Sequence, residues 1–121
     1  MPRTSRRGLE PQAPAHASRL QVIRLSDREG LRVIGEVDLC TREIWRTALG
    51  PVAGNRVPGL DLSRLSFIDA HGTTMLIAAA QHRPGAAPLT LTRPPKVLLK
   101  VLPLLCPAET ANVVIDLQGA S

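Results

Sequence analysis

The sequence predicts one α/β domain, in which helices pack on a mixed β-sheet. Its 121 residues suit a single domain, and 44% of them are hydrophobic, which is enough for one core. Apolar residues recur with strand or helix spacing in the order β-β-α-β-α-β-α-β. Only a polar turn separates the first two strand patterns, which favours a hairpin. The later strands alternate with helices, which favours parallel neighbours joined by right-handed crossovers.

The N-terminal hairpin is predicted from residues 20–25 and 31–37. Apolar and polar residues alternate in part over both segments, as they do in half-buried strands. The polar residues between the two strands end at Gly30, a typical turn residue.

The first helix is predicted over residues 39–49, with Asp38 as its N-cap. Gly50-Pro51 is expected to end this helix, because proline disrupts a helix interior. Its apolar residues recur at i and i+4 and predict one buried stripe, made of Cys40, Ile44, Trp45, Ala48 and Leu49.

The central strand is predicted over residues 60–65, and residues 67–68 extend it toward a short loop. Asp69 is the expected N-cap of the next helix, over residues 70–82. The inner face of this helix is expected to hold Met75, Leu76, Ala79 and Ala80.

The last three elements are a strand at residues 89–92, a helix that begins at residues 94–95 and a strand at residues 113–117. The helix starts with two prolines, which the first helical turn accommodates. Pro103 is expected to kink or end this helix. Its inner face is expected to hold Val97, Leu98, Val101, Leu102 and Leu105.

Residues 1–18 are predicted to be a disordered basic tail, and residues 19–121 the folded domain. The tail is rich in proline, arginine, alanine and serine and has no apolar periodicity. It holds part of the formal net charge of +5, so the domain keeps too little positive charge for a nucleic-acid footprint. Trp45 and Phe67 are the only aromatic residues that could stack on bases. We therefore expect no direct contact with nucleic acid.

The hydropathy pattern predicts a cytoplasmic protein that does not cross a membrane. No apolar run approaches the ~20 residues of a membrane span, and residues 1–19 lack the apolar segment of a signal peptide. In the cytoplasm, Cys40 and Cys106 are expected to be reduced and buried. The cysteines and histidines do not have the spacing of a metal site, so neither a metal nor a cofactor is expected.

Residues 60–76 carry the most specific motif of the chain. In order, they hold D-L-S at 61–63 within a strand, F-I-D at 67–69, and A-H-G at 70–72 where a helix starts. This stretch resembles the signature of the STAS family, the anti-sigma-factor antagonists. G-E-V-D-L at 35–39 resembles the segment that leads into the first helix of that family. The resemblance covers about residues 20–117 and implies the STAS fold, although the residues after Leu117 are too few for the final helix that the family usually adds.

The resemblance implies a protein-binding regulatory module. In the family, a GHKL-type anti-sigma factor, which is a serine kinase, phosphorylates the serine just before the loop glycine. The unphosphorylated antagonist binds the anti-sigma factor and frees a sigma factor, and the added charge of about −2 breaks that complex. In this chain His71 occupies the position of the phosphorylated serine, and Ala70 the position before it. The usual phospho-acceptor is therefore absent, and whether Thr73 or Thr74 replaces it is left open.

The partner-binding residues implied by the resemblance are Asp69, Ala70, His71, Gly72 and Thr73. Asp69 matches the loop aspartate, and Gly72 matches the glycine that is expected to let partner backbone approach the helix start. A helix N-terminus offers free N–H groups and partial positive charge, which suit a phosphate or a partner carboxylate. His71 is expected to be an exposed side chain without chemistry, with a phospho-histidine or a pH-sensitive contact as the other hypothesis.

The predicted function is that of an anti-sigma-factor antagonist that lacks the usual acceptor serine, with an anti-sigma factor as its partner in a bacterial cytoplasm. The alternative is a sensory or small-ligand-binding STAS module of a larger signalling assembly, which an apolar cavity would favour. An enzyme that uses His71 and Asp69 is not expected. The two residues are too close in sequence to orient each other, and no second acid/base cluster, glycine-rich phosphate loop or metal set accompanies them. The sequence leaves self-association open.

Overall fold

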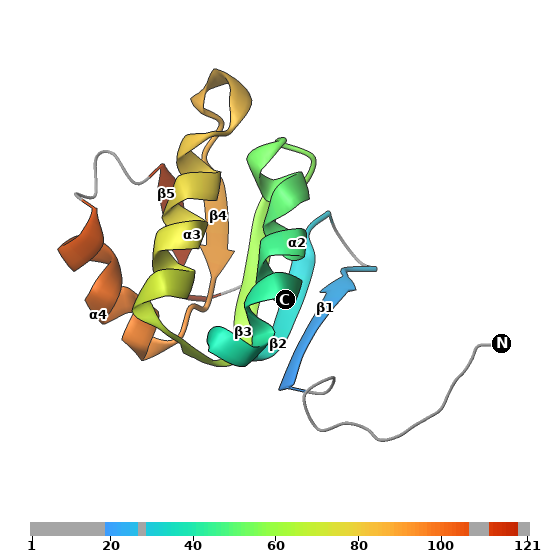
Figure 1. Cartoon of the computed structure of the whole chain (residues 1–121). Helices are drawn as coiled ribbons and strands as arrows, with labels where there is room; N and C mark the ends of the chain where they lie inside the picture. Colours follow the sequence, from blue (N-terminus) through green and yellow to red (C-terminus); the bar gives the residue numbers. More distant parts are fainter. Residues whose placement is uncertain (1–18, 27–28, 107–111, 119–121) are drawn as a thin grey trace, which may run out of the picture.

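A computed structural model describes residues 19–26, 29–106 and 112–118, and Figure 1 shows their arrangement. Within these ranges, a five-stranded sheet with the order β1-β2-β3-β4-β5 carries three α-helices. The element order agrees with the sequence pattern, and the α/β class with a mixed sheet is confirmed. The predicted tail, residues 1–18, lies outside the described residues.

The sheet is mixed because only its first pair of strands is antiparallel. β1 (Leu20–Arg24) pairs antiparallel with β2 (Leu31–Val37), which forms the predicted hairpin. β3 (Gly59–Ile68), β4 (Leu89–Thr92) and β5 (Val113–Asp116) then follow β2 in parallel.

The three α-helices lie side by side on one face of the sheet (Figure 1). They are α2 (Arg42–Ala53), α3 (Ala70–Gln81) and α4 (Lys96–Leu105), and each connects two neighbouring parallel strands. Right-handed crossovers that advance in one direction place their helices on the same face. Two short 3₁₀ helices, η1 (Leu39–Thr41) and η2 (Pro84–Ala86), complete the connections. The opposite face of the sheet carries no helix among the described residues.

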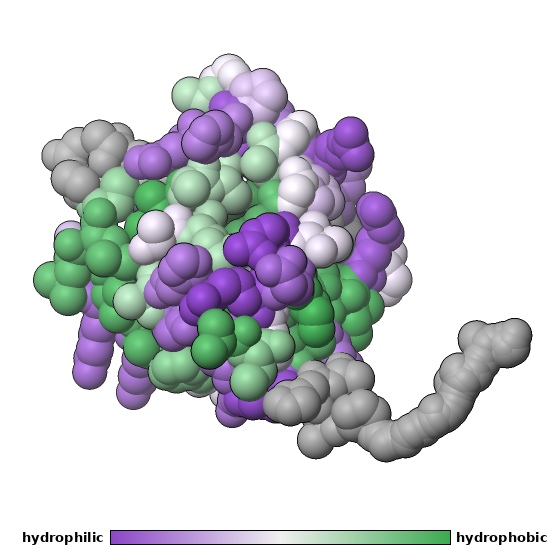
Figure 2. All heavy atoms as spheres, in the orientation of Figure 1, coloured by the Kyte–Doolittle hydropathy of each residue, from purple (hydrophilic) through white to green (hydrophobic). Residues whose placement is uncertain are grey.

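The core lies between the sheet and the helix layer. Trp45, Leu62 and Leu76 have 0% exposure and represent α2, β3 and α3 in it. α4 is less well covered, because Leu104 is 82% exposed, and Figure 2 shows apolar side chains gathered over this helix. Leu105, which the sequence pattern assigns to the inner face of α4, is also exposed. No helix among the described residues combines the length and apolarity that a membrane span requires.

Two prolines lie inside helices that the sequence pattern ends or kinks at them. α2 continues through Pro51 to Ala53, and α4 continues through Pro103 to Leu105. Each proline is near the last turn, where its missing N–H removes one intrahelical hydrogen bond. In α2, the next residue after the proline, Val52, is fully buried, and its packing offsets that loss.

The start of α2 exposes two residues that the i, i+4 pattern assigns to its buried stripe. Cys40 and Ile44 are exposed, whereas Trp45, Ala48 and Leu49 are buried as predicted. The segment opens with η1, which turns with three residues instead of 3.6. Cys40 therefore does not share the face that α-helical spacing would give it. The other cysteine, Cys106, is buried as expected.

Arg83, after the end of α3, is a buried cation that the sequence pattern does not reveal. It is 4% exposed. Its guanidinium donates to the carbonyl oxygens of Val52, Val57 and Ala87 at 2.9, 2.7 and 2.8 Å, and to Asn55 Oδ1 at 2.7 Å. Burial lowers the pKa of Arg83. The side chain ties the loop after α2 to the loop after α3.

Candidate functional site

The motif residues lie at the carboxyl ends of β2 and β3, where α3 begins. These strands are parallel neighbours, and Val37 lies beside Ile68 in their register. The next residue, Asp69, donates its N–H to the Val37 carbonyl oxygen at 3.1 Å. The loop before α3 is therefore fixed to the end of β2.

Asp69 is the N-cap of α3, as predicted. Its Oδ1 accepts the Gly72 N–H at 2.7 Å, and its carbonyl oxygen accepts the Thr73 N–H at 2.9 Å and the Thr73 hydroxyl at 3.0 Å. Its Oδ2 accepts from Arg42 Nη2 at 3.5 Å, which links the cap to the start of α2. Both carboxylate oxygens serve local contacts, so the first role of Asp69 is structural.

Two backbone donors are left over at the start of α3. A helix start leaves four N–H groups without an intrahelical partner. The Asp69 N–H binds the Val37 carbonyl, and the Gly72 N–H binds the Asp69 side chain. The N–H groups of Ala70 and His71 have no acceptor among the described residues. Ala70 and His71 are also exposed, so a group of another molecule can reach these donors.

Gly72 is a packing residue inside the domain, and the expectation that it admits partner backbone stays a prediction. It is buried, and a Cβ atom there would lie 2.6 Å from Val37 Cγ1 and 3.0 Å from Ile68 Cγ1. Its carbonyl oxygen accepts the Trp45 Nε1–H at 3.0 Å. The close approach that requires glycine is therefore made by β2 and β3 of the same domain.

The remaining residues of the loop divide into buried and exposed positions. Thr73 has 0% exposure, so it offers no side chain to a partner in this conformation. Thr74 is exposed, and its hydroxyl donates to the Ala70 carbonyl oxygen at 3.0 Å. Of the predicted partner-binding residues, the structure brings Asp69, Ala70 and His71 to the surface.

Two residues close to this loop in the chain have exposed apolar side chains, to which the sequence pattern assigns no partner role. Leu39, in η1 just after β2, is 74% exposed, and Phe67, near the end of β3, is 42% exposed. Asp38 Oδ1 caps η1 by accepting the N–H groups of Cys40 and Thr41 at 2.9 and 3.2 Å. Their positions in the sequence could have identified them, since Leu39 and Phe67 lie at the ends of the two strands that hold the motif. Exposed apolar groups beside polar groups are typical of protein interfaces.

Asp61 and Ser63 of the D-L-S motif lie on the open face of the sheet, on the side opposite the core residue Leu62, and have a structural role. Ser63 donates its N–H and its hydroxyl to Asp61 Oδ1 at 3.0 and 2.6 Å, and Arg32 Nε donates to Asp61 Oδ2 at 3.0 Å. Burial by itself would raise the pKa of Asp61, but these hydrogen bonds outweigh it and lower the pKa below the ordinary value. The network fixes β3 against β2 without touching the start of α3.

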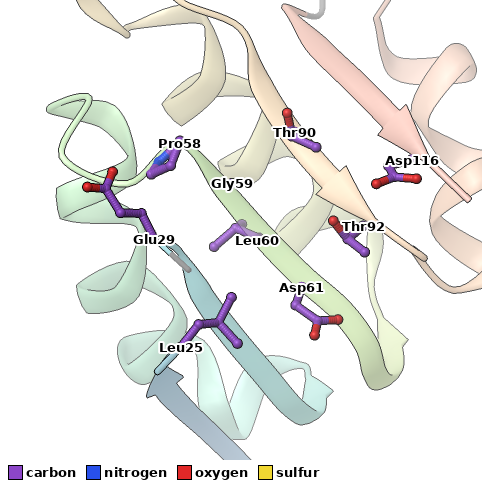
Figure 3. A pocket seen from close by; sticks show the side chains of 9 residues that line it. All are labelled: Leu25, Glu29, Pro58, Gly59, Leu60, Asp61, Thr90, Thr92 and Asp116. Atoms are coloured by element: carbon purple, nitrogen blue, oxygen red, sulfur yellow. The ribbon is translucent and has the colours of Figure 1, made fainter. Parts of the chain in front are cut away.

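Figure 3 shows an open cavity beside Asp61 on this face. Its volume is about 190 Å³, and its lining includes Glu29, Thr90, Thr92 and Asp116. Small-molecule sites usually have about 300–1,000 Å³ and enclose most of their ligand. The described residues also contain no group of three side chains that could hold a metal ion. This cavity therefore gives no support to the small-ligand alternative.

No family model matches the chain, and neither curated proteins nor solved structures gave a match. The resemblance to the STAS family therefore rests on the motif and the element order, and it stays a prediction.

Proposed function

We propose that this domain is a protein-binding regulatory module, similar to the STAS-family anti-sigma-factor antagonists but without their acceptor serine. The proposed partner is a GHKL-type anti-sigma factor, and its capture frees a sigma factor in a bacterial cytoplasm. The module acts by binding and has no catalytic role. One observation carries the proposal: hydrogen bonds hold the start of α3 to the end of β2, while Ala70 and His71 are exposed and their N–H groups have no acceptor among the described residues.

The order of the elements also supports a STAS-like fold. A hairpin leads into a parallel sheet with all its helices on one face, and the motif lies where β3 passes into α3. In the family that the motif resembles, this junction is the regulated surface.

The exposed groups suggest how a partner binds. A partner carboxylate can accept the N–H groups of Ala70 and His71 at the positive end of α3. Such a contact contributes about 0.3–1 kcal/mol at an exposed helix end, so it gives orientation more than affinity. Leu39 and Phe67 supply the apolar area that the remaining affinity requires.

The same geometry makes binding insensitive to serine kinases. Phosphoryl transfer needs a hydroxyl in line with the γ-phosphate, and a misplacement of about 1 Å can lower the rate on the order of 100-fold. His71 has no hydroxyl, the Thr73 hydroxyl is buried, and the exposed Thr74 hydroxyl, three residues past position 71, donates to the Ala70 carbonyl oxygen at 3.0 Å. We therefore propose that the domain is a constitutive binder.

Titration calorimetry with candidate GHKL-type anti-sigma factors tests this proposal. We expect the wild-type domain to bind one of them and His71→Asp to bind at least about tenfold more weakly, a loss of about 1.4 kcal/mol. His82→Asp is the matched control, because His82 is an exposed histidine at the other end of α3. The proposal is wrong if no such protein binds, or if both substitutions weaken binding equally.

A further inference from the structure

The outward side of α4 is an exposed amphipathic surface that the candidate site does not use. Leu98 and Leu102 lie on the inner side of this helix and are buried in the core. The residues that recur at i, i+3, i+4, i+7 and i+8 from Lys96 lie on the side opposite Leu98 and Leu102, and none of them is buried. We call these residues the α4 outer face: Lys96, Leu99, Lys100, Pro103 and Leu104. Figure 2 shows apolar side chains gathered over this helix, and Leu104 is 82% exposed.

The cations of the α4 outer face have no counter-charge on their own helix or on the neighbouring one. Lys96 and Lys100 are the only lysines of the chain, and neither forms an ion pair within the described residues. α4 contains no aspartate or glutamate, and neither does α3, which packs beside it. Lysines stabilise a helix from its last turn, whereas both lie in the first half of α4. The stability of this helix therefore does not explain the two charges.

The composition of this face favours a lipid surface over a protein partner. Protein interfaces are enriched in aromatic residues and depleted in lysine, and leucine is under-represented among the residues that dominate binding energy. The α4 outer face has two lysines and two leucines but no aromatic residue. Helices that lie on membranes combine lysine with leucine, because the lysine stem covers apolar area while its ammonium group stays in the headgroup layer. Because the exposed charges are positive, the lipids that fit are anionic.

We propose that the α4 outer face docks on the surface of an anionic membrane. Leu99, Pro103 and Leu104 enter the boundary between the headgroups and the acyl chains. Lys96 and Lys100 bind phosphate groups of the lipids. Each lysine near such a surface contributes about fivefold in affinity, so the docking is weak and reversible. The domain then lies on the membrane and does not cross it.

The docking does not depend on the proposed function, because the α4 outer face shares no residue with the start of α3. A loss of vesicle binding would leave the proposed capture of an anti-sigma factor unchanged, and the reverse also holds. Together, the two sites would let the domain capture its partner at a membrane surface.

Co-sedimentation of the full chain with vesicles tests the charge requirement. We expect binding to vesicles of equal parts phosphatidylglycerol and phosphatidylcholine to be at least about tenfold tighter than binding to pure phosphatidylcholine. Lys96→Glu combined with Lys100→Glu should lower the affinity for the mixed vesicles at least about tenfold.

Arg24→Glu combined with Arg56→Glu is the matched control, because it changes the net charge equally at exposed positions of β1 and of the loop after α2. Charges more than about 10 Å from the membrane are screened, so this control should lower the affinity less than about threefold. Equal losses in the two double variants would show attraction by the total charge of the chain, to which the arginines of residues 1–18 contribute, and would overturn the proposal. A chain that binds neither kind of vesicle overturns it too.

Leu104→Ser tests the apolar contact on the same mixed vesicles. It should lower the affinity at least about fivefold, because a leucine that enters the membrane leaves water. Leu104 is mostly exposed, so far-UV circular dichroism should show an unchanged fold. Ile23→Ser is the matched control, because Ile23 is 47% exposed on β1, the strand farthest from β5, and it should leave the affinity unchanged.

An affinity that Leu104→Ser does not change would overturn the proposal. Two other occupants of the α4 outer face would overturn it as well. A dimer that forms without vesicles in sedimentation equilibrium and is broken by Leu104→Ser, in a chain that binds no vesicles, would assign the face to a second copy. A complex with an anti-sigma factor that Leu104→Ser weakens, again without vesicle binding, would assign the face to that protein.

Discussion

Replacement of Arg83 by methionine should destabilise the domain by about 3 kcal/mol, a large loss for one side chain. Methionine retains a flexible apolar stem but has no N–H groups. The loops after α2 and α3 would then lose the cation to which their carbonyl groups converge.

The magnitude follows from the acceptors that stay behind. The carbonyl oxygens of Val52 and Val57 accept from Arg83 Nη1 in buried surroundings, at 2.9 and 2.7 Å. A buried acceptor that loses its partner costs about 1–3 kcal/mol, so the two together cost about 2–6 kcal/mol. Part of this cost is recovered, because the variant no longer buries a charge. The cost of burying that charge is the desolvation that lowers the pKa of Arg83. About 3 kcal/mol remains as the expected net loss.

Urea unfolding measures the loss, because Trp45 is the only tryptophan and is fully buried. With an m-value of about 2 kcal/mol/M, the midpoint should fall by about 1.5 M. Arg64→Met is the matched control, since Arg64 is an exposed arginine of β3 and should change stability by less than about 0.5 kcal/mol. Arg83→Lys, which keeps the charge but has fewer donors, should lie between these two. Equal midpoints for Arg83→Met and Arg64→Met would refute the reasoning.

The remaining predictions concern the motif. Gly72→Val should lower the free energy of unfolding by about 1–3 kcal/mol, because its side chain would overlap Val37, and an unchanged thermal midpoint would contradict this. Asp61→Asn should lower it by about 1–3 kcal/mol at pH 7. The pKa of Asp61 is lowered in the folded state. The difference in the free energy of unfolding between the wild type and Asp61→Asn should therefore have its full size above pH 3.8, the ordinary pKa, and should shrink as the pH falls through the folded pKa. A difference that does not depend on pH would exclude a charge effect. With an anti-sigma kinase and labelled ATP, the wild type should stay unlabelled and His71→Ser should be labelled, whereas a wild-type label abolished by Thr74→Ala would show that the acceptor has moved.

The elements with a strong local pattern were predictable from the sequence. β2 and β4 have the predicted bounds, and Asp69 caps α3 as expected. These features depend on neighbours in the chain, namely alternation within a strand and a cap beside its helix. The mixed sheet was predictable as well, because a short turn permits only a hairpin and the later helices require crossovers.

The features that depend on distant backbone were not predictable. Arg83 is buried because carbonyl groups of two other loops converge on it, and a carbonyl group has no sequence signature. Gly72 packs against Val37, which is close only through the parallel pairing of β2 and β3. Cys40 is exposed because the segment opens with a 3₁₀ turn, for which the i, i+4 pattern gives no warning. In each case the residue type alone does not distinguish the observed role from the other roles that this residue type can have.

A substitution at position 71 is expected to change the stability of the domain and its affinity for the partner in opposite directions. A loss of folding cannot produce this combination. The N–H groups of Ala70 and His71 are unpaired among the described residues, at the positive end of α3. An aspartate at position 71 places a carboxylate in the first turn, which stabilises a helix by about 0.3–1 kcal/mol. The same carboxylate competes with a partner carboxylate for the free donors and repels it. His71→Asp should therefore unfold at a slightly higher temperature than the wild type while it binds the partner less tightly. A substitution that weakened binding by damaging the fold would lower both the unfolding temperature and the affinity for the partner. A higher unfolding temperature together with a lower affinity therefore locates the effect at the start of α3.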